Sequence, residues 1–449
     1  MPTSAEETLS AWLEAFNDPA SAALEAFTSE RADIGRAASL WQEYRARSGP
    51  LKLLSVQATA PDGVEAVDQD RWDHFLQIKL ALGSEPPGRI TSLQGGLIPP
   101  PKHLAPARVG WPDLRRALEA KLAEAIAKDW MFGALIVSKD SKPLFAAAYG
   151  DADREQKIAN TLDTRFRMGS MNKMMTGVAA LQLDEAGAIA LDDPVGRHLP
   201  DYPSRAFAET VTIWHLLNHT GGAGDFFGPE FEAHRLQLRD LEDYVALFGH
   251  RDPEFEPGSQ HRYANYGFMV LGRIIEVASG GSYDDYVAAH IFAPAGMAST
   301  GALPESIEVP GRAVGYMGSP TGLVRNDMTL PVRGTSAGGG YSTVGDLVRF
   351  AEATTSGLLL GAERTGLIMN DGVETEPDAK YGMGFVKYAG GGERWFGHGG
   401  GAPGQNGILT IFPDTGYVVA ALSNGDPPQA SSLAEFIRLR LPLVSAAAV

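Results

Sequence analysis

The chain has 449 residues and a formal net charge of −17, and it contains no cysteine. A chain of this length exceeds what one hydrophobic core usually holds, so two domains are expected. The lack of cysteine excludes disulfides, thiolate catalysis and cysteine zinc sites. The acidic charge argues against nucleic acid or an anionic membrane as a partner, because phosphates would be repelled.

The first residues, "MPTSAEETLSAWLEAF", have the pattern of an acidic amphipathic helix, without a basic segment followed by an apolar one. The sequence holds no run of 18 or more apolar residues, so no membrane span is expected. We therefore expect a cytoplasmic protein, although a signal peptide that had been removed would leave no trace in this sequence.

Residues 1–100 have the pattern of a small domain. Apolar residues at helical spacing predict helices over about 5–28 and 31–48. Four strand-like segments follow, "LKLLSVQATA", "GVEAVDQD", "DHFLQIKLAL" and "RITSLQGGLIP". Helices followed by a meander of strands predict an α+β domain, which resembles the SnoaL-like or cystatin-like roll with low specificity. Proline-rich residues 101–111 are then the linker.

Residues 112–449 have the pattern of a second, larger domain. A helix over 113–128 precedes two strands within "MFGALIVSKDSKPLFAAAYG", and another helix is predicted over 170–187. A mostly helical middle reaches about residue 300. Two strands follow in "GILTIFPDTG" and "YVVAALSNG", and a last helix starts near residue 430. We expect an antiparallel sheet built from both ends of this region and flanked by helices.

The first candidate site is Ser170 with Lys173, within "FRMGSMNKMMT". At this spacing both side chains share one helix face, with Cβ atoms about 5–6 Å apart. A serine hydroxyl needs a base to become a nucleophile, and a lysine is a base only when its pKa is lowered by burial or a nearby cation. The surrounding methionines fit a desolvated site, and a helix N-terminus favours a developing oxyanion. The alternative is a chance S-x-x-K spacing on a surface helix.

The second element is Tyr263 with Asn265, within "FEPGSQHRYANYGFMVLG". A tyrosine hydroxyl can relay protons, and an asparagine amide can orient a lysine and bind a substrate carbonyl. The alternative is structural, because Asn265 would also suit the start of the helix that its apolar neighbours predict.

The third element is "WFGHGGGAPG", in which His398 precedes Gly399, Gly400 and Gly401 ahead of a strand. Glycines at a strand edge let another backbone approach closely and leave N–H groups as donors. The alternative is a flexible loop. The three elements in this order are much rarer than any one of them.

With the segments "TIWHLLNHTGG" and "AGGGYSTVGDLVRF", these motifs make residues 112–442 resemble the serine β-lactamase and penicillin-binding-protein superfamily. More narrowly, the chain resembles the class C β-lactamase-like branch that includes family VIII carboxylesterases. The resemblance implies a serine β-lactamase-like fold of α/β, or more narrowly α+β, class. In this fold an antiparallel sheet is flanked by helices and carries a helical subdomain.

The resemblance also implies a role for each catalytic residue. Ser170 attacks the acyl carbonyl, and Lys173 is the general base. Tyr263 shares the proton and passes it to the leaving group. Asn265 positions Lys173 and the substrate.

In the third motif, the resemblance implies an oxyanion hole made by the N–H groups of Ser170 and Gly401, with His398 and Gly400 in the same substrate-binding segment. The β-lactamases of this superfamily usually carry Lys-Thr-Gly here, and that lysine helps to bind the β-lactam carboxylate. This chain has His398 instead, which weakens the β-lactamase interpretation and favours esterase-like members.

Ser336 competes with Ser170, because "GTSAG" at 334–338 matches the G-x-S-x-G signature of another hydrolase fold. That signature needs a buried strand before the serine and a helix directly after it. The segment before Ser336 contains a proline and no β-branched run, and glycines follow it. A triad of Ser336, Asp378 and His398 is formally possible, but a glycine turn near the rim of the active site is favoured.

The roles of four further residues are open at this point. His215 and His219 have a spacing that can bind zinc, but no H-E-x-x-H frame surrounds them, so buried, hydrogen-bonded histidines are favoured. Neither a metal nor a cofactor is expected. Arg325 and Arg333 are candidates for the positive charge that the third motif lacks.

We predict a serine hydrolase that cleaves small-molecule carboxylic esters through a covalent acyl-enzyme, without a nucleic-acid or membrane partner. Phe226, Phe227 and Phe231 would line an apolar pocket or belong to the core. The alternatives are a β-lactamase or D-amino-acid peptidase or amidase, an acyltransferase using the same acyl-enzyme, and a non-enzymatic binding relative. A homo-oligomer also stays open.

Overall fold

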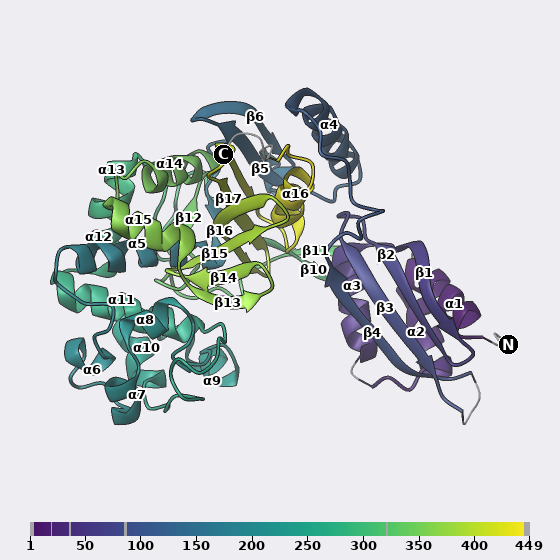
Figure 1. Cartoon of the computed structure of the whole chain (residues 1–449), viewed down its shortest axis with the longest axis horizontal. Helices are drawn as coiled ribbons and strands as arrows, with labels where there is room; N and C mark the ends of the chain where they lie inside the picture. The colour runs from purple at the N-terminus through teal and green to yellow at the C-terminus, as the bar shows by residue number, and fades with distance from the viewer. Residues whose placement is uncertain (1–3, 19, 36, 85–87, 320–321, 444–449) are drawn as a thin grey trace. The chain divides into compact units, whose positions relative to one another are not determined.

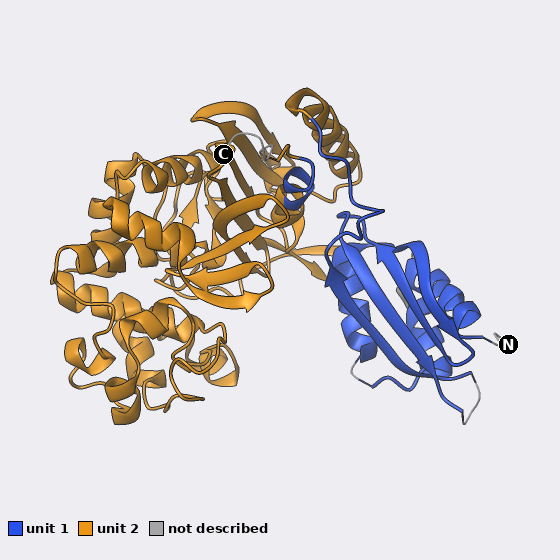
Figure 2. Cartoon of the chain, in the orientation of Figure 1, with its two compact units in different colours: residues 1–109, 435–440 blue, residues 110–434, 441–449 orange. Residues whose placement is uncertain are grey.

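The computed structural model (Figure 1) describes residues 4–18, 20–35, 37–84, 88–319 and 322–443. The chain divides into two compact units, shown in Figure 2: residues 1–109 with 435–440, and residues 110–434 with 441–449. The domain borders derived from the sequence stay a prediction.

In the first unit, the described residues up to Ile98 form three helices and an antiparallel sheet in the order β1-β2-β3-β4. Trp12, Phe16 and Trp41 are buried in its core, and the rings of Trp12 and Trp41 meet edge to face with centroids 4.9 Å apart. The elements are α1 (Ala5–Asn17), α2 (Ser21–Arg31), α3 (Ala37–Ser48), β1 (Lys52–Ala60), β2 (Gly63–Gln69), β3 (Phe75–Leu82) and β4 (Ile90–Ile98).

The four predicted strands and the α+β class of this unit are confirmed, but both predicted helices differ. The helix over 5–28 is interrupted at Asp18, which has an extended conformation because it precedes a proline. The helix over 31–48 begins only at α3, because Ala32 pairs with Ile90 and the amide of Asp33 donates to the carbonyl of Ile90 at 2.7 Å.

The second unit is built on an antiparallel sheet whose described strands have the order β13-β14-β15-β16-β17-β18-β5-β6. β18 pairs with β5, so the prediction of a sheet built from both ends of this region is confirmed. The strands are β5 (Gly133–Lys139), β6 (Lys142–Tyr149), β13 (Val373–Glu376), β14 (Ala379–Gly382), β15 (Phe385–Gly390), β16 (Glu393–Ala402), β17 (Gln405–Phe412) and β18 (Tyr417–Ser423).

Short strand pairs lie outside this sheet. β9 pairs with β12, and β10 forms a hairpin with β11. The bounds are β7 (Asp151–Asp153), β8 (Ile158–Ala159), β9 (Phe166–Arg167), β10 (Tyr316–Ser319), β11 (Gly322–Arg325) and β12 (Tyr341–Ser342).

One helix, α5 (Asn172–Glu185), is buried on nearly all sides, so it lacks the polar stripe of a surface helix. It packs against α11 (Asn265–Ser279), and Figure 1 shows α6 to α10 gathered beyond α11, away from the sheet. The other helices are α4 (Trp111–Ala127), α6 (Val195–His198), α7 (Arg205–Thr210), α8 (Ile213–Leu217), α9 (Pro229–His234), α10 (Leu241–Phe248), α12 (Tyr283–Val287), α13 (Ala293–Ala295), α14 (Val344–Thr355), α15 (Ala362–Asn370) and α16 (Gln429–Arg438).

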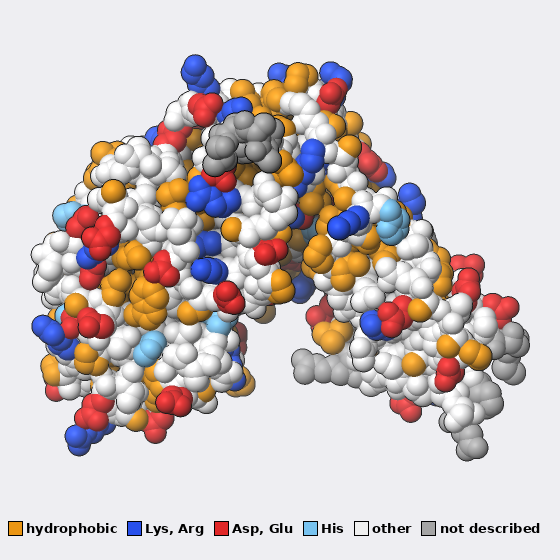
Figure 3. Space-filling model, in the orientation of Figure 1, with side chains coloured by type: hydrophobic (Ala, Val, Ile, Leu, Met, Phe, Trp, Pro, Cys, Tyr) orange, Lys and Arg blue, Asp and Glu red, His pale blue; other side chains and the backbone are white. Residues whose placement is uncertain are grey.

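Among the described residues, no helix is both long enough and apolar enough to cross a membrane. On the face shown in Figure 3, acidic and basic side chains are interspersed. The net charge of −17 is therefore not collected in a single patch on that face.

Candidate active site

Ser170 lies in a short 3-10 turn, Gly169–Met171, directly before α5. The helix predicted over 170–187 is therefore wrong at its start. Gly169 has φ +54°, in the region that favours glycine, and its carbonyl accepts a hydrogen bond from the amide of Gly339 at 3.2 Å. This turn leaves Ser170 half-buried at the N-terminus of α5.

Lys173 is fully buried in the first turn of α5. Its Nζ donates to Oδ1 of Asn265 and to the backbone oxygen of Ala337, each at 2.7 Å. Burial lowers the pKa of Lys173 to about 7, and the carboxylate of Asp225 opposes this shift. Because both hydrogen-bond partners are neutral, they do not compensate a full positive charge. A neutral amine is thus accessible near pH 7, which general-base chemistry requires.

Tyr263 lies in the loop before α11, and its ring centroid is 4.7 Å from Nζ of Lys173. Loss of water around the hydroxyl raises the pKa of Tyr263 above its ordinary value, and a hydrogen bond with the side chain of Ser170 partly opposes the rise. Tyr263 is therefore a neutral phenol at neutral pH. The residue is 39% exposed, so a group bound beside Ser170 can reach it.

Asn265 is the first residue of α11, but its side chain makes no capping hydrogen bond. Its Oδ1 accepts from Lys173, and its Nδ2 donates to Oδ2 of Asp225 at 2.8 Å. The alternative that Asn265 caps the helix is therefore wrong. Instead its amide connects Asp225 to Lys173.

Asp225 was missed by the sequence analysis. Its Oδ1 accepts from the amides of Phe226 at 2.7 Å and Phe227 at 3.2 Å, which leaves Oδ2 for Asn265. The pattern of an aspartate bonding to the next backbone amides indicates a turn. It does not indicate what the second carboxylate oxygen contacts, because Asn265 lies 40 residues away in the chain.

The phenylalanines beside Asp225 have different environments. Phe226 and Phe231 are buried, and their rings pack together with centroids 5.3 Å apart. Phe227 is 58% exposed. The two interpretations were pocket lining and core, and Phe226 and Phe231 are core residues.

The third motif forms part of β16, not a flexible loop. A Cβ atom at Gly400 would lie 1.8 Å from the carbonyl oxygen of Met168 and 3.0 Å from the amide nitrogen of Ser170. A Cβ atom at Gly169 would lie 2.9 Å from the amide nitrogen of Gly401. Glycine is thus required for the two backbones to meet, and the amides of Ser170 and Gly401 lie on the adjoining segments.

His398 is buried, with Nε2 3.2 Å from the hydroxyl of Tyr381 and Nδ1 against the carbonyl of Gly399. Burial, with a further contribution from the Lys173 cation, lowers the pKa of His398 to about 3. His398 is therefore neutral at neutral pH and does not supply the positive charge of a lysine at this position.

The two arginines considered for that charge already form ion pairs. Nε of Arg325 lies 3.2 Å from a carboxylate oxygen of Asp327. Arg333 pairs with Asp284 and also donates from Nε to the backbone oxygen of Ala302 at 3.2 Å. Each arginine thus has a carboxylate partner of its own.

Ser336 is fully buried, and its Oγ lies 4.0 Å from the sulfur of Met269. The described residues around it have no strand directly before the serine and no helix directly after it, so the strand-turn-helix of the G-x-S-x-G signature is absent there. The next residue, Ala337, contributes its carbonyl to Lys173. The favoured turn is therefore present, with Thr335 and Gly338 bonded to each other, but it is buried beside Lys173 and does not lie at the rim of the site.

The two histidines with zinc-like spacing have separate structural roles. His215 caps the start of α8, where its Nδ1 accepts from the amide of Thr212 at 3.2 Å. His219 is buried, and its Nδ1 accepts from the amide of Ala264 at 3.1 Å. Burial lowers the pKa of His219 well below its ordinary value. Within the described part of the chain, no group of three or more metal-ligating side chains is found.

This fold, together with a half-buried serine beside a buried lysine, a tyrosine and an asparagine, defines a serine hydrolase of the β-lactamase and penicillin-binding-protein type. The chain belongs to the β-lactamase family, whose model matches residues 118–441. The resemblance and the fold class derived from the sequence are thereby confirmed for the catalytic unit.

Individual relatives include penicillin-binding proteins and an esterase. Penicillin-binding protein 4 of Amycolatopsis lactamdurans is 32% identical over 301 residues, which are 63% of this chain and 78% of that protein. Esterase EstB of Burkholderia gladioli is 33% identical over 214 residues, 44% of this chain and 54% of the esterase. These and other curated relatives are matched over 40% to 78% of their own length.

Among solved structures, a penicillin-binding protein from Bacillus halodurans is similar with a TM-score of 0.65 and 32% identity. The similarity covers 70% of this chain and 98% of that one. Because esterases and penicillin-binding proteins both appear among the relatives, likeness alone does not select between ester and peptide substrates.

The close approach at Gly400 yields a test. Gly400→Ala places a methyl group against the Met168 carbonyl and costs about 1–3 kcal/mol of unfolding free energy, as for other overpacked sites. Gly399→Ala is the matched control, because its Cβ would make ordinary contacts of 3.4 Å and 3.6 Å. Thermal unfolding of both variants measures the difference. An equal melting temperature for the two would contradict the packing described for this strand.

Proposed function

We propose that this serine hydrolase cleaves carboxylic esters through a covalent acyl-enzyme on Ser170. The observation that carries the proposal is the state of Lys173, which is fully buried, is held by two neutral acceptors and has a pKa near 7. A lysine in this state accepts the hydroxyl proton of a serine close by, so the serine can attack a carbonyl.

In the proposed acylation, Oγ of Ser170 bonds to the ester carbonyl carbon while its proton passes to Lys173. The carbonyl electron pair moves onto oxygen and returns as the bond to the alcohol breaks. The amides of Ser170 and Gly401 face the developing oxyanion, which the N-terminus of α5 also favours. Water then attacks the acyl-enzyme, releasing the acid and regenerating Ser170.

Tyr263 is assigned as the proton donor to the departing alcohol. As a neutral phenol it does not act as the first base, but it donates its proton to the leaving oxygen and recovers one from the Ser170–Lys173 pair. Its hydrogen bond to Ser170 and its exposure support this role. Asn265 keeps Nζ of Lys173 in place through its Oδ1.

Two observations favour esters. His398 is neutral, so the third motif does not provide the cation that a β-lactam carboxylate would meet there. The relative EstB is named an esterase. A peptidase or amidase acting on D-amino acids is the second candidate, because a D-stereospecific amidohydrolase from Streptomyces has a similar structure, with a TM-score of 0.61 and 26% identity.

The choice of nucleophile is tested by Ser170→Ala, with Ser336→Ala as the matched control. Without a nucleophile, turnover of p-nitrophenyl esters falls by at least about 10³-fold, whereas Ser336→Ala retains a substantial part because its hydroxyl is buried against Met269. Nitrocefin and a D-Ala-D-Ala peptide are assayed in parallel. Loss of activity in the Ser336 variant alone would overturn the assignment. Faster turnover of the peptide or nitrocefin than of any ester would favour the second candidate.

Asp225 provides a test based on pH. In the free enzyme, kcat/KM rises with pH as Lys173 loses its proton, with a midpoint near the pKa of about 7. Since the Asp225 carboxylate raises the pKa of Lys173, Asp225→Asn removes that effect and moves the midpoint to lower pH. The new side chain keeps one oxygen, so it accepts from Asn265 only when its NH2 group is turned toward the amides of Phe226 and Phe227. The exposed Asp201→Asn variant serves as control. An unchanged midpoint, or one at higher pH, would argue against Lys173 as the titrating base.

A further inference from the structure

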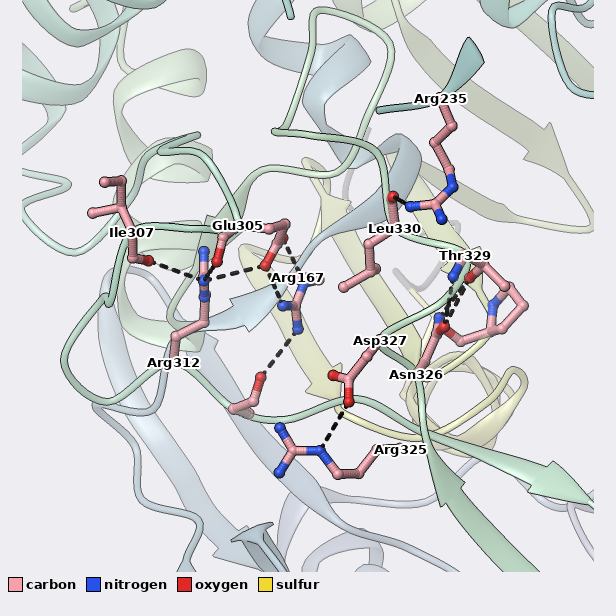
Figure 4. Close-up of polar contacts among 12 residues, drawn as sticks. Arg167, Arg235, Glu305, Ile307, Arg312, Arg325, Asn326, Asp327, Thr329 and Leu330 are labelled. Carbon is pink, nitrogen blue, oxygen red and sulfur yellow. Dashed lines mark hydrogen bonds and ion pairs between the residues drawn. The ribbon is translucent and has the colours of Figure 1, made fainter. Parts of the chain in front are cut away.

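A pocket of about 480 Å³ in the second unit is lined by several arginines. We call it the arginine pocket, and its charged lining residues are Arg167, Arg235, Arg312, Arg325, Glu305, Glu308 and Asp327. All of these except Glu308 are labelled in Figure 4. Arginines outnumber carboxylates here although the whole chain carries a net charge of −17. The volume lies within the range of small-molecule sites, about 300–1,000 Å³.

Part of this positive charge is neutralised by ion pairs within the protein. Arg167 donates from Nε and Nη2 to the two carboxylate oxygens of Glu305, at 2.9 and 2.5 Å, and from Nη1 to the carbonyl of Ala313 at 3.1 Å. The bidentate pair with Glu305 fixes the wall of the pocket. Arg167 is therefore a structural residue of the pocket.

Only some of the N–H groups of Arg312 have hydrogen-bond partners. It shares the carboxylate of Glu305 at 3.1 Å, and its Nη2 donates to the carbonyls of Glu305 and Ile307 at 3.3 and 3.2 Å. Its side chain is 10% exposed, and its Nη1 is buried without a hydrogen-bond partner among the described residues. Burial lowers the pKa of Arg312, against the opposing effect of Glu305.

Arg235 approaches from the end of α9. Its Nη1 donates to the carbonyl of Leu330 at 2.5 Å, which is a neutral partner. Its Nε is also buried without a partner in the described part of the chain. A buried N–H group on a charged side chain is costly when it is left unsatisfied. Two residues that line the same pocket each carry such a group, which indicates that an acceptor is missing there.

The arginine pocket adjoins the candidate active site along the chain. Arg167 lies three residues before Ser170. On another wall, Nδ2 of Asn326 donates at 2.7 Å to the carbonyl of Pro403, which directly follows β16. The strand that carries Gly400 and Gly401 therefore ends beside this pocket.

We propose that the arginine pocket binds a carboxylate group, and that this carboxylate belongs to the ester substrate at a position remote from the scissile bond. The donors are the guanidinium groups of Arg235 and Arg312, which line the pocket and each keep an N–H group without a partner among the described residues. A carboxylate accepts several N–H donors at once, and such charge-assisted hydrogen bonds are strong. The second part of the proposal rests on the proposed esterase function, whereas binding of a carboxylate in the pocket does not.

Binding is measured first, by titrating adipate into the Ser170→Ala variant in a calorimeter. We expect saturable binding that is weakened at least about tenfold by adding Arg235→Gln. Arg205→Gln is the control, because Arg205 is 88% exposed and pairs with Glu209. No saturable binding, or equal binding after Arg235→Gln, would overturn the site. Since the protein used has no Ser170 hydroxyl, the result is independent of whether Ser170 is the nucleophile.

Two matched substrate pairs then identify the source of the carboxylate. The first pair, mono-4-nitrophenyl adipate and 4-nitrophenyl hexanoate, tests a carboxylate on the acyl chain. The second pair, 3-carboxyphenyl butyrate and 3-carbamoylphenyl butyrate, tests a carboxylate on the leaving group. In at least one pair, kcat/KM favours the carboxylate member by about tenfold or more. Arg235→Gln abolishes that preference and Arg205→Gln retains it. Adipate binding without a preference in either pair would overturn the substrate assignment and leave a site for a separate carboxylate ligand.

Discussion

The structure depends on the burial of one lysine nitrogen. Nζ of Lys173 is removed from water and meets two neutral oxygens, those of Asn265 and Ala337. A pKa that falls from 10.5 to about 7 corresponds to roughly 5 kcal/mol against the ammonium form. Neutral acceptors keep this penalty in place, whereas a carboxylate in direct contact would cancel much of it. Asp225 acts from the far side of Asn265, so it orients the amide while it only moderates the shift.

The same requirement explains how distant segments are joined. The burial of Lys173 needs the hydrophobic surroundings of α5, the start of α11 and the "GTSAG" segment, which meet where Lys173, Asn265 and Ala337 make contact. Backbone packing completes the arrangement, because Gly400 in β16 lies against the turn that presents Ser170. The nucleophile, the base and the candidate oxyanion donors therefore occupy fixed positions through packing.

Much of this could be predicted from the sequence, because Ser170, Lys173, Tyr263 and Asn265 belong to short motifs with recognisable spacing. The paired end strands and the α+β class of the first unit also followed from local patterns. The contribution of Asp225 could not be found in this way, since its contact with Asn265 is made in three dimensions.

The remaining errors have local physical causes. Asp18 interrupts a helix because of the proline after it, and the helix predicted from Ser170 begins as a 3-10 turn before α5 starts at Asn172. The "GTSAG" motif lacks the strand before it and the helix after it that its signature needs, as the sequence indicated. Its role in presenting the carbonyl of Ala337 to a lysine is a backbone property, and no side-chain pattern reports it.

The central claim is that Ser170 reacts because Lys173 is a neutral base. The most direct measurement is the rate at which a serine-directed phosphonate labels the protein as a function of pH, with the labelled peptide identified by mass spectrometry. The account predicts a single label on Ser170, a rate that rises through about pH 7, and labelling that is slow at every pH in Lys173→Met. A label on Ser336, or an unchanged rate and profile in Lys173→Met, would contradict it.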